Sequence, residues 1–141
     1  MLYEKKRMFG QGVIDLTSLA LGTPAYAGMA FGTDEATASA IDYEAENQQF
    51  PDANTLEAFG STTATSAGGT ATLALTLQSS KDKATWKDEV SFTLGQSEIT
   101  EGTLLRRFTV PAQAHRYIRI KLAVGTEAFT AGKIFALMRP L

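Results

Sequence analysis

Few side chains in this sequence are placed to do catalytic chemistry. The single histidine, His115, stands between an alanine and an arginine at the start of a predicted strand. A general base needs a positioned nucleophile and an orienting acid, and no such spacing is present. Residues 10–15 and 95–99 each lack a glycine that a dinucleotide fingerprint or a nucleophile elbow requires. We therefore expect no enzymatic activity and no catalytic residue.

Metal-binding chemistry has little more support. The chain contains no cysteine, which excludes disulfides, thiolate nucleophiles and cysteine-ligated zinc. Asp42, Glu44 and Glu46 alternate with other residues, so an extended backbone would direct all three carboxylates to one side. Calcium requires several oxygen ligands at once, but no glycine or Asn/Asp pattern shapes a ligand loop here. We interpret these residues as a solvated or partner-facing acidic strip, and we expect no metal and no cofactor.

Charge is distributed unevenly along the chain. The sequence has 13 Lys and Arg against 15 Asp and Glu, a formal charge of −2. Residues 8–80 contain eight acidic residues and no Lys or Arg, whereas residues 81–141 contain ten basic and six acidic residues. The two regions either neutralise each other within one fold or allow an acidic face to meet a basic face of another molecule. The sequence leaves both interpretations open.

The basic residues gather on two predicted strands as Arg106, Arg107, Arg116 and Arg119. Nucleic acid favours such a group, but few aromatic residues accompany it and the domain is net acidic. We expect no nucleic-acid partner and favour pairing with an acidic neighbour. Trp86, the single tryptophan, is either a core residue or an exposed platform for a sugar or an interface.

The elements that position these residues are mostly strands. Residues 71–78, 85–94, 103–110, 116–124 and 132–138 alternate between apolar and polar side chains, with short Gly, Pro, Ser and Asp turns between them. This pattern predicts an antiparallel sandwich or barrel rather than βαβ units. The length of 141 residues suits one domain, residues 1–141.

The first half of the sequence has weaker patterning. Residues 12–16 are compatible with a short strand and residues 33–49 with one short helix. We predict an N-terminal arm over residues 1–9 and a long irregular loop, or partner-contacting insertion, over residues 29–69. The basic start is not followed by a signal-peptide core, and no run reaches the ~20 apolar residues of a membrane span. We therefore expect no membrane partner and synthesis in the cytoplasm.

Several segments of the second half resemble one known family. They are residues 69–80 (GTATLALTLQSS), a turn and strand around Trp86, residues 116–122 (RYIRIKL) and residues 129–134 (FTAGKI). In this order they are similar to the Bbp16-type capsid cement proteins of tailed bacteriophages, over about half of the chain. Alternating strands with RYIR also occur in discoidin-like sugar-binding jelly rolls.

The resemblance implies an all-β fold, an antiparallel jelly-roll-like sandwich with an extended N-terminal arm and a long irregular loop segment. It also implies a structural virion protein on the capsid exterior, which bridges adjacent subunits of the phage major capsid protein. Copies would associate with each other, and we favour a dimer over a trimer because two-fold contacts are the commonest symmetric solution. Assembly would take place in the host cytoplasm.

Charge and position predict three contact surfaces: the arm, the acidic strip and the basic group. Their residues are Tyr3, Met8, Phe9, Asp34, Glu35, Asp42, Glu44, Glu46, Arg106, Arg107, Arg116 and Arg119. Two alternatives remain. A carbohydrate-binding jelly-roll module of a phage adhesin would expose Trp86 and Tyr117, and a head–tail connector or tail subunit would form a ring of fixed copy number.

Overall fold

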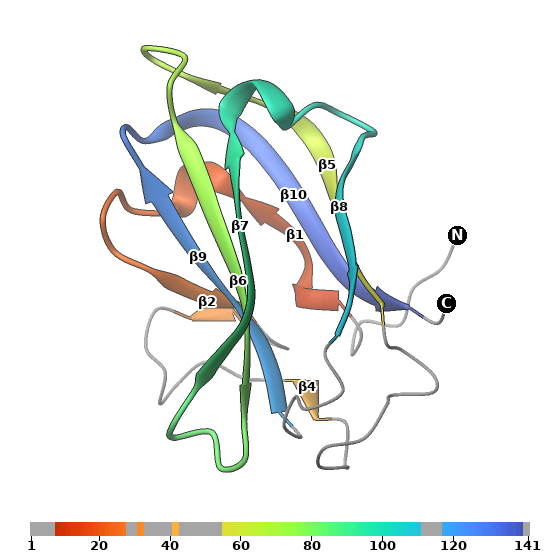
Figure 1. Cartoon of the computed structure of the whole chain (residues 1–141). Coiled ribbons are helices and arrows are strands. Elements are labelled where there is room, and N and C mark those ends of the chain that lie inside the picture. Colours follow the sequence, from red (N-terminus) through yellow and green to blue (C-terminus); the bar gives the residue numbers. More distant parts are fainter. Residues whose placement is uncertain (1–7, 28–30, 33–40, 43–54, 111–116, 140–141) are drawn as a thin grey trace.

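The computed structural model describes residues 8–27, 31–32, 41–42, 55–110 and 117–139. Within these ranges the chain forms strands and two short 3-10 turns, which Figure 1 shows as two layers packed face to face. The elements are β1 (Met8–Asp15), η2 (Leu16–Ser18), β2 (Ala25–Ala27), β3 (Phe31–Gly32), β4 (Ile41–Asp42), β5 (Thr55–Ser66), β6 (Thr72–Ser80), β7 (Lys87–Gly95), η3 (Gln96–Glu98), β8 (Leu104–Thr109), β9 (Tyr117–Gly125) and β10 (Phe129–Arg139).

The strands form two antiparallel sheets. Sheet A has the order β1-β10-β5-β8, and sheet B has the order β3-β2-β9-β6-β7, with β4 also paired to β9. The chain passes back and forth between the sheets, and the strand order is that of a jelly roll. The prediction of an all-β, antiparallel, jelly-roll-like sandwich is confirmed. No helix among the described residues is long and apolar enough to cross a membrane.

The core lies between the inner faces of the two sheets. The predicted alternation in residues 71–78 is confirmed, because Leu73, Leu75 and Leu77 are completely buried. Each such side chain contributes about 1.5–3 kcal/mol through burial. The buried cluster also includes β9 and sheet A side chains, among them Ile118, Ile120, Leu122, Leu56, Ala58, Ile134 and Ala136.

Part of the predicted long loop is instead a central strand. Residues Thr55–Ser66 form β5, which pairs with β10 on one side and with β8 on the other. The prediction of an irregular segment over residues 29–69 was therefore wrong for these residues. Its small and polar side chains give no clear alternation of apolar and polar residues in the sequence. Backbone hydrogen bonds to its two neighbouring strands stabilise it. The remainder of 29–69 lies outside the described residues, except for β3, β4 and the turn after β5.

The predicted arm also ends earlier than residue 9. Met8 and Phe9 belong to β1, where they pair with Leu137 and Ala136 of β10. Residues 1–7 lie outside the described residues. The strand predicted near residues 12–16 is present as the second half of β1, and the helix predicted within 33–49 falls on residues that are mostly not described. The two described residues of that range, Ile41–Asp42, form strand β4.

Strand β8 contains a shift that the alternation did not predict. Leu104 is 39% exposed, whereas the next residue, Leu105, is buried. The register between β5 and β8 changes between Ala58 and Phe59, so one extra residue enters β8 there. Such a β-bulge turns the following side chains to the opposite face. Leu104 is thereby placed on the outer face of sheet A.

Gly60 of β5 lies directly beneath the turn that precedes β8. Its N–H donates to the Thr103 carbonyl oxygen, and its carbonyl accepts from Gly102 N–H, both at 2.9 Å. A Cβ atom at this position would lie 2.1 Å from the carbonyl oxygen of Thr100. Backbone on both sides of the contact leaves no flexible atom to move. Any larger residue therefore separates β5 from the turn.

We predict that Gly60→Ala lowers the free energy of unfolding by about 3 kcal/mol through this overpacking. Gly102→Ala, in the same turn, is the control. Gly102 has φ +76° and nothing within 4 Å of its Cβ position, so only the backbone penalty of about 1 kcal/mol applies. Urea unfolding of both variants measures the difference, and equal losses would contradict the steric argument.

Candidate interaction surface

Arg119, predicted as an exposed contact residue, is completely buried. Its guanidinium lies between the rings of Tyr26 and Trp86, 3.9 Å from each ring centroid. Arg119 Nε donates to Gln78 Oε1 at 2.8 Å. The prediction was wrong because two aromatic faces and an amide replace the water that a surface arginine would contact.

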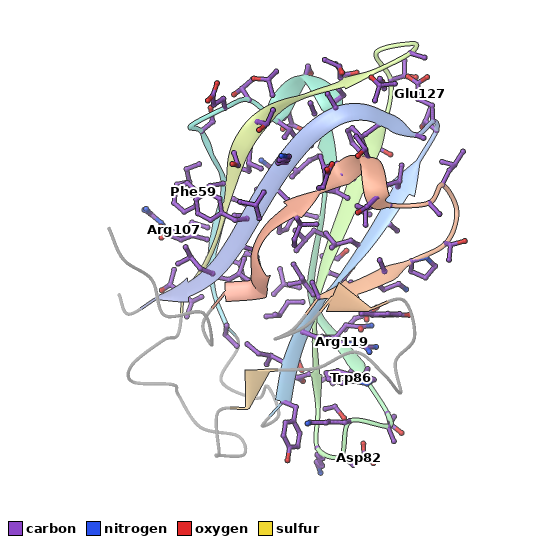
Figure 2. All side chains as sticks on the ribbon, turned by 180° about the vertical axis from the view of Figure 1, so that it is seen from behind. Phe59, Asp82, Trp86, Arg107, Arg119 and Glu127 are labelled. Carbon is purple, nitrogen blue, oxygen red and sulfur yellow. The ribbon has the colours of Figure 1, made fainter. Side chains whose placement is uncertain are left out.

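The amide of Gln78 extends this contact into a chain of three residues. Gln78 Nε2 donates to Asp88 Oδ1 at 2.8 Å, which joins β9, β6 and β7 through side chains. Gln78 and Arg119 both belong to segments that carry the family resemblance. Figure 2 shows Arg119 and Trp86 together toward the end of the sandwich that also carries Asp82. The most recognisable motif of the sequence therefore serves to fix sheet B.

Trp86 is half-buried, and the guanidinium of Arg119 covers one face of its indole ring. Its burial therefore lies between the two alternatives that the sequence left open, a core residue and an exposed platform. A sugar-binding platform presents a bare aromatic face to its ligand. The covered face cannot serve in this way.

The two arginines of β8 remain accessible and are paired within the chain. Arg107 Nε donates to Glu57 Oε2 at 2.5 Å, and the Glu57 side chain is only 1% exposed. Arg106 Nη2 lies 3.2 Å from Glu98 Oε1, and its guanidinium lies 5.6 Å from the centroid of Phe92. Hydrogen bonds from Gly95 N–H and then from Arg106 lower the pKa of Glu98. At these two positions the charges neutralise each other within one fold.

The other predicted contact residues are only partly described. Met8 and Phe9 form ladder pairs in β1, and Asp42 of β4 pairs with Tyr117 of β9. The remaining residues lie outside the described part of the chain: Tyr3, Asp34, Glu35, Glu44, Glu46 and Arg116. Among the described residues, no group of three His, Cys, Asp or Glu side chains is arranged to hold a metal ion.

One end of the sandwich is held by Glu127, a residue that sequence analysis missed. Its carboxylate accepts hydrogen bonds from the N–H groups of Gly68 and Thr70 and from the hydroxyls of Ser66 and Thr70, at 2.7–3.0 Å. These contacts join the β5–β6 turn to the β9–β10 turn. With Thr70 N–H the largest cause, they lower the pKa of Glu127 from 4.5 to about 2. The small, polar residues of the turn between β5 and β6 are evident in the sequence, but the sequence did not predict that Glu127 accepts the hydrogen bonds of this turn.

The opposite end is shaped by the β6–β7 turn. Asp82 Oδ1 accepts hydrogen bonds from Thr85 N–H at 3.0 Å and Ala84 N–H at 2.8 Å, and both lower the pKa of Asp82. Lys83 adopts a left-handed backbone with φ 64°, and its ammonium lies 4.9 Å from the Tyr117 ring centroid. Figure 2 shows Asp82 and Glu127 at opposite ends of the molecule. Hydrogen bonds to one carboxylate thus fix each end, within a single turn at Asp82 and between two turns far apart in the sequence at Glu127.

These features describe a closed sandwich with an aliphatic interior and ordered ends, and the comparisons with known proteins agree with a structural role. The Bbp16 family model matches residues 26–138. The chain belongs to the Bbp16 family. Bbp16 is a phage-associated family, so the chain is a phage-related protein.

Two other comparisons add little to this assignment. No curated protein matches the chain. Among solved structures the chain is similar to one described as "Crystal structure of PirA", with 11% sequence identity and a TM-score of 0.38. That match covers 91% of this chain and 83% of the other. The likeness is too low to bear on function.

We predict that Arg119→Lys lowers the free energy of unfolding by about 2–3 kcal/mol, because lysine lacks the planar group that fills the space between two rings. Arg106→Lys, which changes a partly exposed pair, is the control and costs less than about 1 kcal/mol. Chemical denaturation measures both. Equal losses in the two variants would show that the stacked arginine has no special role.

We predict that Glu127 makes stability depend on pH at the acid end. Its folded pKa lies below its unfolded pKa, so its contribution is complete above about 4.5 and is lost as the pH falls toward about 2. The difference in unfolding free energy between the wild type and Glu127→Gln should shrink across this range. A difference that stays constant from pH 6 to pH 2.5 would contradict the assignment.

Proposed function

We propose that the protein is a capsid cement, or decoration, protein of a tailed bacteriophage. It binds the outer surface of the capsid and joins neighbouring subunits of the major capsid protein. The proposal rests on the match of the Bbp16 family model to residues 26–138. The sequence resemblance implies the cement role for this family. The location is therefore the virion exterior, reached from the host cytoplasm during assembly.

The fold suits a mechanical role. Packaged DNA presses outward on the shell, and a protein bound across two subunits opposes their separation. Such a clamp must transmit force without deforming, and a close-packed interior with hydrogen-bonded ends deforms little. Each contact need only be modest, because many copies act together on one closed particle. This function requires no catalysis, cofactor, nucleic acid or membrane, and it is compatible with association of copies, with a dimer favoured over a trimer.

Saturable co-sedimentation with capsid shells stripped of the protein tests the proposal. We expect binding that saturates on the order of hundreds of copies per particle, as many repeated sites on one shell require, together with greater heat resistance of the shell. Saturation at about a dozen copies would instead indicate a ring at one vertex, as in a head–tail connector. Absence of binding would also contradict the cement role. Quenching of Trp86 fluorescence by sugars would then test the adhesin module.

A further inference from the structure

The two outer faces of the sandwich differ in chemistry. On the outer face of sheet B, strands β6 and β7 carry small side chains, including Thr72, Ala74, Thr76, Ser91 and Thr93. Elsewhere on this face Arg119 lies between the rings of Tyr26 and Trp86. The outer face of sheet A carries large apolar side chains at its centre. A structural protein that contacts a partner through one face needs such a difference between its faces.

The large apolar side chains of sheet A form a row across its strands. Phe59 of β5 pairs in register with Phe135 of β10 on one side and with Leu104 of β8 on the other. Val13 of β1 comes one residue before Ile14, whose partner Ile134 comes one residue before Phe135. Register partners share a face, and neighbouring residues along a strand alternate between faces. Phe135, Phe59 and Leu104 therefore lie side by side on β10, β5 and β8. Val13 belongs to the same outer face on β1, at the point where the β1–β10 register shifts before Ile14. We call these four residues the apolar row.

Two residues of the apolar row are exposed to solvent, and the other two are half-buried. Val13 is 52% exposed and Leu104 is 39% exposed, and with Leu21 they are the large exposed hydrophobic residues of the described chain. The half-buried rings of Phe59 and Phe135 stack between them, 5.1 Å apart and 17° from parallel. Four strands span about 14 Å at the usual strand spacing. Contiguous apolar surface of this kind, rimmed by polar groups, marks interaction sites.

Exposed cations lie on both sides of the row. Arg107, whose side chain is 57% exposed, lies over the buried carboxylate of Glu57, two residues along β5 from Phe59 (Figure 2). Lys133 is exposed two residues from Phe135 on the other side of the row and pairs in register with Asp15. The Asp15 carboxylate accepts from the N–H and hydroxyl of Thr17, which hold it toward η2. The exposed guanidinium of Arg107 and the exposed ammonium of Lys133 therefore flank the apolar carbon, and each has one carboxylate of this chain nearby, Glu57 and Asp15.

We propose that the apolar row is the docking surface for a segment of the shell's major capsid protein that carries an apolar side chain between carboxylates. The apolar side chain packs on the Phe59–Phe135 stack, and the carboxylates approach Arg107 and Lys133. Aromatic rings and arginine at the centre of a contact commonly supply most of its affinity. This inference rests on the proposed function and adds to it the face and the chemistry of the partner.

The double variant Val13→Ser/Leu104→Ser tests the row directly. Both side chains are exposed, so the substitutions leave the core intact, and the unfolding transition of each variant verifies this. Leu21→Ser is the matched control, because Leu21 is 51% exposed but lies beside Val124 of sheet B. We expect the double variant to bind stripped shells at least about tenfold more weakly, equivalent to about 1.4 kcal/mol, and Leu21→Ser to bind as the wild type does.

A charge reversal tests the cationic flank independently. We expect Lys133→Glu to weaken shell binding, most strongly at low ionic strength, because it presents a carboxylate to a carboxylate. Lys81→Glu is the control, since Lys81 is exposed on the β6–β7 turn, away from sheet A. Weakening by both reversals alike would indicate general attraction to an acidic shell and would overturn the assignment to this face.

The outcomes separate this inference from the proposed function. If the wild type does not bind shells, the proposed function fails. If the wild type binds and the double variant binds equally well, the docking surface lies elsewhere and this inference fails. Sedimentation velocity of the free proteins covers the remaining case. A double variant with lower oligomeric mass and normal shell binding would assign the row to contacts between copies and would also overturn the proposal.

Discussion

Packing between the inner faces of the two sheets is the interaction on which the rest of the structure depends. Leu73, Leu75 and Leu77 of β6 must face the interior, so the residues between them must face outward. The same alternation in β9 turns Arg119 outward, onto the outer face of sheet B, where Tyr26 and Trp86 enclose it. The closed interior thus leaves the outer faces and the two ends of the sandwich for contacts with other molecules.

The sequence predicted those strands whose two faces differ clearly in polarity. Residues 71–78 and 116–124 alternate between aliphatic and polar side chains in the sequence, and the structure has strands β6 (Thr72–Ser80) and β9 (Tyr117–Gly125) there. Strand β5 could not be predicted in this way. Its inward positions include Ala58 and Gly60, and at Gly60 the backbone of Thr100 leaves no room for a side chain. Small residues of this kind carry no alternating signal. Only its pairing with β8 and β10 makes the segment a strand.

Charge alone did not predict which arginines are buried and which are exposed. Arg119 and Arg107 are equivalent in a count of basic residues, yet one is completely buried and the other is exposed. Their burial differs because the fold brings different partners to them from distant segments of the chain. A local sequence pattern does not contain this information. The apolar row has the same origin, since β1, β5, β8 and β10 each contribute one side chain. The bulge in β8 that exposes Leu104 is visible only in the register.

In the account proposed above, this sandwich joins subunits of a shell through the outer face of sheet A. A cryo-electron microscopy reconstruction of shells decorated with the purified protein tests this account most directly. The account predicts many symmetry-related copies on the exterior, each with the outer face of sheet A toward the shell and density in contact with Phe59 and Phe135. Copies that instead face the shell with Thr76 and the rest of sheet B, or that occupy a single vertex, would contradict it.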